Sequence, residues 1–204
     1  MSTKTHSLQA VGEYFHIYNR GVNRNHIFLE ERNYEYFVRR MKTYLNPEKM
    51  ALIVYCLMPN HFHLIVRQDE PYALSNFMKG VCDGYAKAIN KRFKRSGHLF
   101  QGKYKIKHID DPSYLLHLSR YIHLNPVAAR LTQCPEGWKY SSYQEYCGMR
   151  EASIVECDVI LSRFKDRAGY VQFVRDYKPG DREKVQKFLF VRREQEDLHL
   201  TMRA

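Results

Sequence analysis

The sequence predicts an α+β fold, an antiparallel sheet with helices on one face, followed by a helical extension at the C-terminus. Two observations lead to this prediction. Short alternating or apolar runs that suit strands are interspersed with segments of helical period, and they follow one another in the order β-α-β-β-α-β. That order is typical of a ferredoxin-like (RRM-like) sandwich, whose second sheet face stays available for a ligand.

The first half of the pattern begins with EYFHIYNRG at 13–21, which alternates and ends in a glycine turn, as a strand does. A helix follows at 33–45, where apolar residues recur at helical spacing behind a capping asparagine. Residues 51–57 and 61–67 are apolar runs around the turn sequence MPN, so we expect a hairpin of buried strands.

The second half of the pattern starts with a helix at 75–93, whose apolar residues recur every three or four positions. Residues 96–109 then read as a strand with a glycine turn. A last helix is predicted at 111–124, because Asp111 is a good cap and Pro112 suits the first helical position.

Length and composition fit one domain with an appendage. The chain has 204 residues, 44% of them hydrophobic, which is enough to bury a core. Near residue 150 the composition shifts to charged helical sequence, so we predict a domain at 1–150 and a helical extension without an assigned role at 151–204. Five cysteines without C-x-x-C spacing argue against a disulfide framework, and no apolar run suits a membrane span or an export signal.

Charge is the strongest global signal. The net charge is +11, which favours a polyanionic partner, nucleic acid ahead of an anionic membrane. Residues 79–107 hold nine Lys or Arg against one acid, a net charge of +8, with aromatic residues interleaved as on a surface that tracks phosphates and stacks bases. A solvated basic face is the alternative. The candidate contact residues in this segment are Lys91, Arg92, Lys94, Arg95, Lys103, Lys105 and Lys107.

Two histidines one residue apart interrupt the third predicted strand. The period of two would place His61 and His63 on one face, with their stems roughly 7 Å apart, and Phe62 on the other. Two imidazoles so placed can lean onto one divalent ion, but Mg²⁺ or Mn²⁺ needs further ligands. A pair of hydrogen-bonded structural histidines is the competing interpretation.

The predicted helix at 111–124 offers a partner for this pair. Tyr121 and Asn125 are spaced by four residues and would share a face if the helix persists that far, as a possible nucleophile and a possible oxygen ligand. Pro126 disfavours helical geometry at the residue before it. A packed aromatic residue and a helix C-cap are therefore the alternative roles.

Five segments appear in an order that resembles a known family. They are EYFHIYNRGVNRNHIF, LMPNHFHLIV, GHLFQGKYK, RYIHLNPVAARL and WKYSSYQEY, within residues 12–148. The sequence resembles the REP-associated tyrosine transposases, which are relatives of the single-strand insertion-sequence transposases within the one-tyrosine HUH nucleases.

The resemblance implies a mechanism for these residues. RYIHLNP places the family's catalytic tyrosine at Tyr121, and NHFH supplies the histidine pair, so that His61, His63 and Asn125 would hold Mg²⁺ or Mn²⁺. Attack by Tyr121 on single-stranded DNA near an imperfect hairpin would give a 5′-phosphotyrosine link and a free 3′-OH.

The resemblance also implies partners and excludes others. Asn19 and Arg20 match a recurrent N-terminal element, where we expect DNA contact. We expect a cytoplasmic, nucleoid-associated protein without a small-molecule cofactor, and favour a monomer over a dimer. The alternatives are a non-catalytic hairpin-binding regulator derived from a transposase, an RNA-binding module on the same sheet, and a replication initiator or relaxase.

Overall fold

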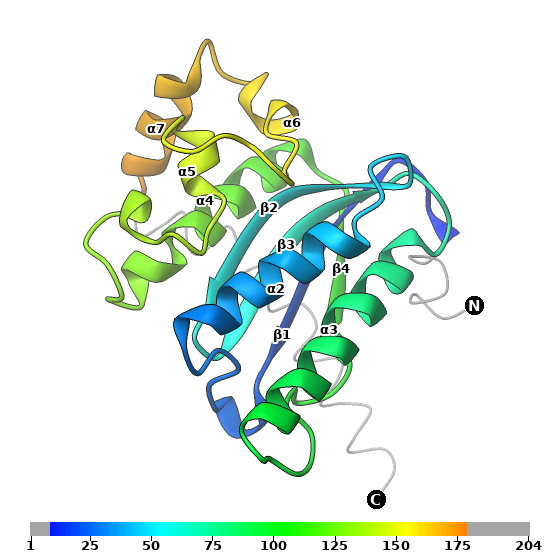
Figure 1. Ribbon diagram of the computed structural model, residues 1–204. Helices are drawn as coiled ribbons and strands as arrows, with labels where there is room; N and C mark the ends of the chain where they lie inside the picture. Colours follow the sequence, from blue (N-terminus) through cyan, green and yellow to red (C-terminus); the bar gives the residue numbers. More distant parts are fainter. Residues whose placement is uncertain (1–8, 179–204) are drawn as a thin grey trace, which may run out of the picture.

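A four-stranded antiparallel sheet with the strand order β2-β3-β1-β4 organises the molecule (Figure 1). The computed structural model describes residues 9–178. Its elements in chain order are β1 (Glu13–Arg20), η1 (Val22–Arg24), α2 (Glu31–Tyr44), β2 (Met50–Met58), β3 (His61–Gln68), α3 (Ala73–Arg92), β4 (Lys105–Ile109), α4 (Pro112–Ala128), η2 (Pro135–Gly137), α5 (Tyr143–Tyr146), α6 (Asp158–Leu161) and α7 (Arg167–Arg175). The predicted α+β class and the β-α-β-β-α-β order are confirmed.

The first layer of the sandwich consists of α2 and α3, which lie side by side across one face of the sheet (Figure 1). The core between them and the strands is aromatic. The ring of Phe37 on α2 lies 5.2 Å from that of Phe62 on β3 and 5.0 Å from that of Tyr85 on α3, measured between centroids. All three side chains are fully buried, which fixes Phe62 to this face and its neighbours in the strand to the other.

The second face of the sheet is covered in part by α4, which packs against β2 and continues into the segments around α5 (Figure 1). Every residue of β2 is buried, because this strand lies between the two helical layers. A sandwich with helices on one face only would leave the second face of the sheet open. Here α4 covers part of that face. The candidate site lies on this second face, over β1 and β3 and beside β4.

Two element boundaries differ most from the prediction, and the predicted cap Asn33 lies inside α2, whose N-cap is Glu30. The strand expected at 96–109 is formed only at Lys105–Ile109, because the segment before it is a loop in which Gly97 and Gly102 have φ angles of 82° and 147°. The helix expected to end at 124 continues to Ala128 through Pro126, whose ring is buried. The free energy gained by burying the proline ring outweighs the loss of the helical hydrogen bond that a backbone N–H would have made at this position.

Residues 151–178 pack back onto the sheet domain. Tyr170 on α7 is fully buried, and its hydroxyl lies 2.7 Å from Nδ1 of His123 on α4. Val155 forms a single parallel bridge with Leu52 on β2. The division of the chain at residue 150 stays a prediction, and the last part of the predicted extension, 179–204, lies outside the described residues. Within 9–178, no helix is long and apolar enough to cross a membrane.

His123 gives the fold a dependence on pH. Burial lowers the pKa of its imidazole to about 3, and its two nitrogens contact the hydroxyls of Tyr170 and Ser142. In the unfolded chain this imidazole takes up a proton as pH falls through about 6.5, whereas in the folded protein it stays neutral down to about pH 3. The contribution of neutral His123 to the free energy of unfolding is therefore complete above pH 6.5 and is lost as pH falls toward 3.

We therefore expect the variant His123→Gln to be less stable than the wild type at pH 7.5, by a margin that narrows on acidification. Between pH 7 and pH 4.5 the narrowing should be on the order of 2 kcal/mol in the free energy of unfolding, measured by urea denaturation. His26→Gln, at an exposed histidine, serves as the control. A difference between His123→Gln and the wild type that stays constant with pH would contradict this account.

Candidate active site

Two histidine side chains project from β3 toward the second face of the sheet. The ring centroids of His61 and His63 lie 5.1 Å apart, and the ring planes are nearly perpendicular, at 84°. Both side chains are partly exposed, whereas Phe62 between them is fully buried against the first layer. The alternation predicted for this strand is confirmed, and it brings two imidazoles together on one face.

Asn60 holds His61 in one tautomer. Nδ2 of Asn60 donates to the carbonyl oxygen of Arg24, which leaves Oδ1 of the amide facing Nδ1 of His61 at 2.6 Å. Because an amide oxygen only accepts, the imidazole proton must lie on Nδ1 and Nε2 carries a lone pair. Burial, and then the charge of Arg20 on the neighbouring strand, lower the pKa of His61 to about 4. The ring is therefore neutral at physiological pH, as a metal ligand must be.

His63 is also held neutral and contacts a third histidine. Its Nδ1 lies 2.9 Å from Nε2 of His16 on β1. Burial lowers the pKa of His63 well below its usual value, and the neighbouring His16 and His61 lower it further. All three rings lie on the same face of the sheet.

Tyr121 reaches this face from α4. The helix begins at Asp111, whose carboxylate accepts a hydrogen bond from the backbone N–H of Ser113, 2.7 Å away. From there it crosses toward β2, and the ring of Tyr121 packs against the edge of His63, with the centroids 6.2 Å apart and the planes at 74°. The tyrosine is partly exposed, so its ring borders the histidine pair and still meets solvent.

Asn125 lies one helical turn beyond Tyr121. The predicted helix ended at residue 124, whereas α4 continues through Pro126 and so includes Asn125. Its Nδ2 is buried and has no hydrogen-bond partner among the described residues. The oxygen and nitrogen of an amide have nearly the same shape, so a rotated Asn125 would place an unpaired oxygen there. Within 9–178, no group of three His, Cys, Asp or Glu residues is arranged to hold a metal. Two neutral imidazoles and an amide oxygen would give a divalent cation three protein ligands.

Two of the predicted basic residues share the face of the histidines. In the sheet register Lys105 lies opposite Tyr18, which in turn lies opposite His63, and Lys107 lies opposite His16. Side chains opposite one another in an antiparallel pair point to the same face. β4 is an edge strand, and Lys105 is exposed while Lys107 is partly buried.

Asn19 has a different place from the one expected of a DNA contact. Its side chain is buried, and its Nδ2 donates to the carbonyl oxygen of Gly102 at 3.0 Å. Arg20 is exposed and donates from Nε to the side-chain oxygen of Gln101. Together they hold the loop 93–104 against the end of β1, next to His61, so any effect of Asn19 on DNA binding would act through this loop.

The remaining basic residues divide between two locations. Lys94, Arg95 and Lys103 belong to the loop 93–104 beside the histidine end of the sheet. Lys91 and Arg92 lie on the last turn of α3, which packs on the first face, and Arg92 forms a 2.9 Å ion pair with Glu30. The structure therefore gathers part of the predicted basic set near the histidines and leaves two members on the opposite layer.

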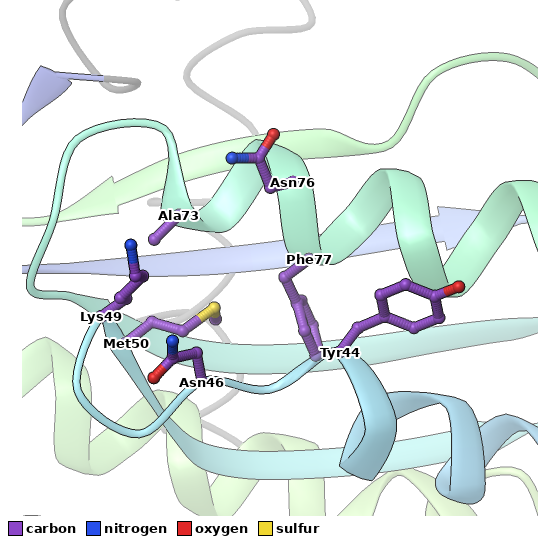
Figure 2. A pocket seen from close by; sticks show the side chains of 7 residues that line it. All are labelled: Tyr44, Asn46, Lys49, Met50, Ala73, Asn76 and Phe77. Atoms are coloured by element: carbon purple, nitrogen blue, oxygen red, sulfur yellow. The ribbon is translucent and has the colours of Figure 1, made fainter.

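A small pocket elsewhere is separate from this arrangement. It has a volume of about 120 Å³ and opens between the end of α2, the start of β2 and the start of α3 (Figure 2). Its lining residues are Tyr44, Asn46, Lys49, Met50, Ala73, Asn76 and Phe77. Met50 pairs with Gln68, whereas Met58 pairs with His61, so the pocket lies roughly 25 Å from the histidines along the hairpin.

A tyrosine packed against a histidine pair on a four-stranded sheet is the arrangement expected of a single-tyrosine transposase. Residues 10–125 match the family model described as IS200-like transposase, which is more than half of the chain and includes both Tyr121 and Asn125. The chain belongs to the IS200-like transposase family, whose members cut and rejoin DNA and generally use a divalent metal.

One solved structure agrees with this assignment at the level of the fold. A REP-associated tyrosine transposase bound to a REP hairpin matches with a TM-score of 0.60 and 15% identity, over 72% of this chain and 93% of that chain. A candidate transposase of Deinococcus radiodurans R1 matches with a TM-score of 0.41 and 16% identity, over 55% of this chain and 91% of that chain. No curated protein matches the chain.

Sequence reasoning did not find His16. Alternation within the first strand places it on the same face as Tyr18, but nothing local says which strand lies alongside. The contact with His63 depends on the pairing of β1 with β3 across 47 residues of sequence. The signal that could have found His16 is its presence in EYFHIYNRG, one of the segments that resemble the family.

Proposed function

We propose that the protein is a metal-dependent endonuclease and strand transferase for single-stranded DNA, with Tyr121 as its nucleophile. The observation that carries this proposal is the packing of Tyr121 against His63, beside a second neutral imidazole. Asn125 lies one helical turn beyond Tyr121, and its Nδ2 is buried without a hydrogen-bond partner among the described residues. A phosphodiester needs an in-line nucleophile and neutralisation of its non-bridging oxygens, and both would be available in one place.

Tyr121 would attack a phosphorus atom of the DNA with its phenolic oxygen. The new bond joins this oxygen to phosphorus, the bond from phosphorus to the 3′ oxygen breaks, and the phenolic proton passes through solvent to the departing 3′ oxygen. The products are a 5′-phosphotyrosine and a free 3′-OH. The reverse attack by a 3′-OH restores a phosphodiester and the free tyrosine, so cleavage and joining are one reaction in two directions.

His61, His63 and Asn125 would hold a divalent cation next to this phosphate. Mg²⁺ or Mn²⁺ supplies Lewis acidity to a non-bridging oxygen when it is bound. The protein's own contribution is to keep both imidazoles neutral and to orient His61 through Asn60. Lys105 and Lys107 would neutralise the phosphate charges of a DNA strand bound along this edge of the sheet.

The substrate in this proposal is single-stranded DNA that folds into an imperfect hairpin. Two features support it: the basic loop 93–104 at the histidine end of the sheet, and the hairpin bound by the structurally similar transposase. Because Tyr121 lies beside the histidines of its own chain, one monomer would suffice for cleavage. The protein would then act on nucleoid DNA in the cytoplasm.

A denaturing gel tests the proposal directly. The protein is incubated with a labelled pool of hairpin-bearing single strands and Mn²⁺, with and without a chelator, and binding is scored in parallel on a native gel. We expect a covalent protein–DNA band that disappears with the chelator, because two neutral imidazoles carry no charge of their own and could only bind the metal that neutralises the phosphate.

Sequencing of the bound strand would then identify the target. A bound complex without any covalent band, under every metal condition, would overturn the proposal in favour of a non-catalytic hairpin-binding regulator. A covalent band that persists in the chelator would contradict the metal dependence alone.

A further inference from the structure

His16 lies next to the candidate metal ligands, and the proposed mechanism gives it no role. It is fully buried on β1, its Nε2 is 2.9 Å from Nδ1 of His63, and the two ring planes are within 20° of parallel. At this distance the two nitrogens form a hydrogen bond, in which one carries the proton and donates it and the other accepts.

The direction of this hydrogen bond decides whether His63 can bind a cation. A neutral imidazole carries one proton. If His16 donates, His63 must keep its own proton on Nε2 and cannot coordinate through that atom. If His63 donates from Nδ1, its Nε2 has a lone pair directed away from His16. The partner of His61 is an amide oxygen that can only accept, whereas the partner of His63 can act in either direction.

A comparison with His123 separates a functional role from a structural one. His123 is equally buried, and both of its nitrogens have partners, the hydroxyls of Tyr170 and Ser142. His16 has a buried Nδ1 that has no hydrogen-bond partner within the described residues. An unpaired buried polar atom costs free energy, so packing and stability alone do not account for a histidine at this position.

We propose that His16 is a positioning residue for the metal site. It accepts the Nδ1 proton of His63 and thereby fixes His63 in the tautomer, and in the ring orientation, that presents Nε2 to a divalent cation. Its own proton then lies on the unpaired Nδ1. The inference rests on the proposed function, in which His63 is a metal ligand, and it has the form of an outer-shell contact that orients a ligating histidine.

Mn²⁺ binding to the purified, DNA-free protein tests this role without any reaction. Affinity is measured by calorimetry and by the loss of the free Mn²⁺ signal in electron paramagnetic resonance. His16→Leu keeps most of the volume and removes the acceptor, so we expect Mn²⁺ affinity to fall on the order of 10- to 100-fold. His16→Gln places an amide oxygen near the position of Nε2, so affinity should stay within about threefold of the wild type.

Two further variants make the outcome specific. Phe15→Leu perturbs the same strand on its other face, where Phe15 is buried, and should leave Mn²⁺ affinity unchanged. His63→Ala distinguishes the two proposals. If it does not weaken Mn²⁺ binding, the proposed metal site is wrong, whereas weakening by His63→Ala with no effect of His16→Leu overturns the role of His16 alone.

The tautomers provide a second readout that a purely structural role would not produce. Two-bond proton–nitrogen spectra of ¹⁵N-labelled, Mg²⁺-saturated protein report which ring nitrogen carries each proton. We expect both His16 and His63 to be protonated on Nδ1. A His16 protonated on Nε2 in the Mg²⁺-saturated wild type would overturn the inference, even if His16→Leu weakens Mn²⁺ binding through a disturbed strand.

Discussion

Replacing Tyr121 by phenylalanine should abolish the covalent protein–DNA product, by at least roughly a thousandfold, while hairpin binding stays within about twofold of the wild type. The change removes one oxygen atom and leaves the ring that packs against His63. The oxygen that would form the bond to phosphorus in the proposed mechanism is then missing. The covalent product is measured on a denaturing gel and binding on a native gel, at equal protein concentrations.

Tyr114→Phe is the matched control for this experiment. Tyr114 lies on the same helix, two turns earlier, and is buried. We expect this variant to form the covalent product at close to the wild-type level. If Tyr121→Phe kept the product while Tyr114→Phe lost it, the nucleophile would have been assigned to the wrong tyrosine.

Removing the imidazoles of His61 and His63 should reduce the covalent product about as strongly as Tyr121→Phe does, because the metal site is lost instead of the nucleophile. In the double variant His61→Ala/His63→Ala we expect Mn²⁺ affinity to fall more than about a hundredfold, and the covalent product with it, because two of three protein ligands are lost. Mn²⁺ affinity is measured by calorimetry. Thermal unfolding checks that the variant is folded, which we expect because both side chains are only partly buried.

Adding excess Mn²⁺ distinguishes the loss of a metal ligand from the loss of the nucleophile. The single variant His61→Ala keeps His63 and Asn125, so an excess of Mn²⁺ should restore part of the product, whereas no Mn²⁺ concentration should restore it in Tyr121→Phe. His108→Ala, on the other face of β4, is the control histidine. Rescue of Tyr121→Phe, or full activity of the double variant, would exclude the proposed division of roles.

The sequence predicted those parts of the candidate site that depend on local pattern. The alternation of His61, Phe62 and His63 follows from the period of a strand, and the structure has it. The helix that carries Tyr121 could be read from its cap, but its end could not. Pro126 argues locally for a stop, and only the buried position of its ring explains why α4 continues past it.

Contacts between distant segments could not be predicted. The bond between His16 and His63 depends on which strands pair and in which register, and neither is written in either segment. The burial of Asn19 is a second example, because DNA contact at this residue stays a prediction and its motif does not reveal that the amide lies against Gly102. The pattern of 96–109 predicts a strand throughout, because alternation near glycines does not reveal the positive φ angles of Gly97 and Gly102.

The attachment of α4 to β2 limits how strands can be exchanged. His123 on the inner side of this helix contacts Ser142, whose hydroxyl in turn bonds the backbone of Tyr55 on β2, and all of these groups are buried. Tyr121 therefore cannot swing outward unless this network breaks. A DNA end joined to it would stay anchored beside the histidines, and the incoming strand would have to travel to that end. In the proposed reaction the choice of joining partner would rest with the folding of the nucleic acid, because this buried network fixes α4, which carries Tyr121, to β2.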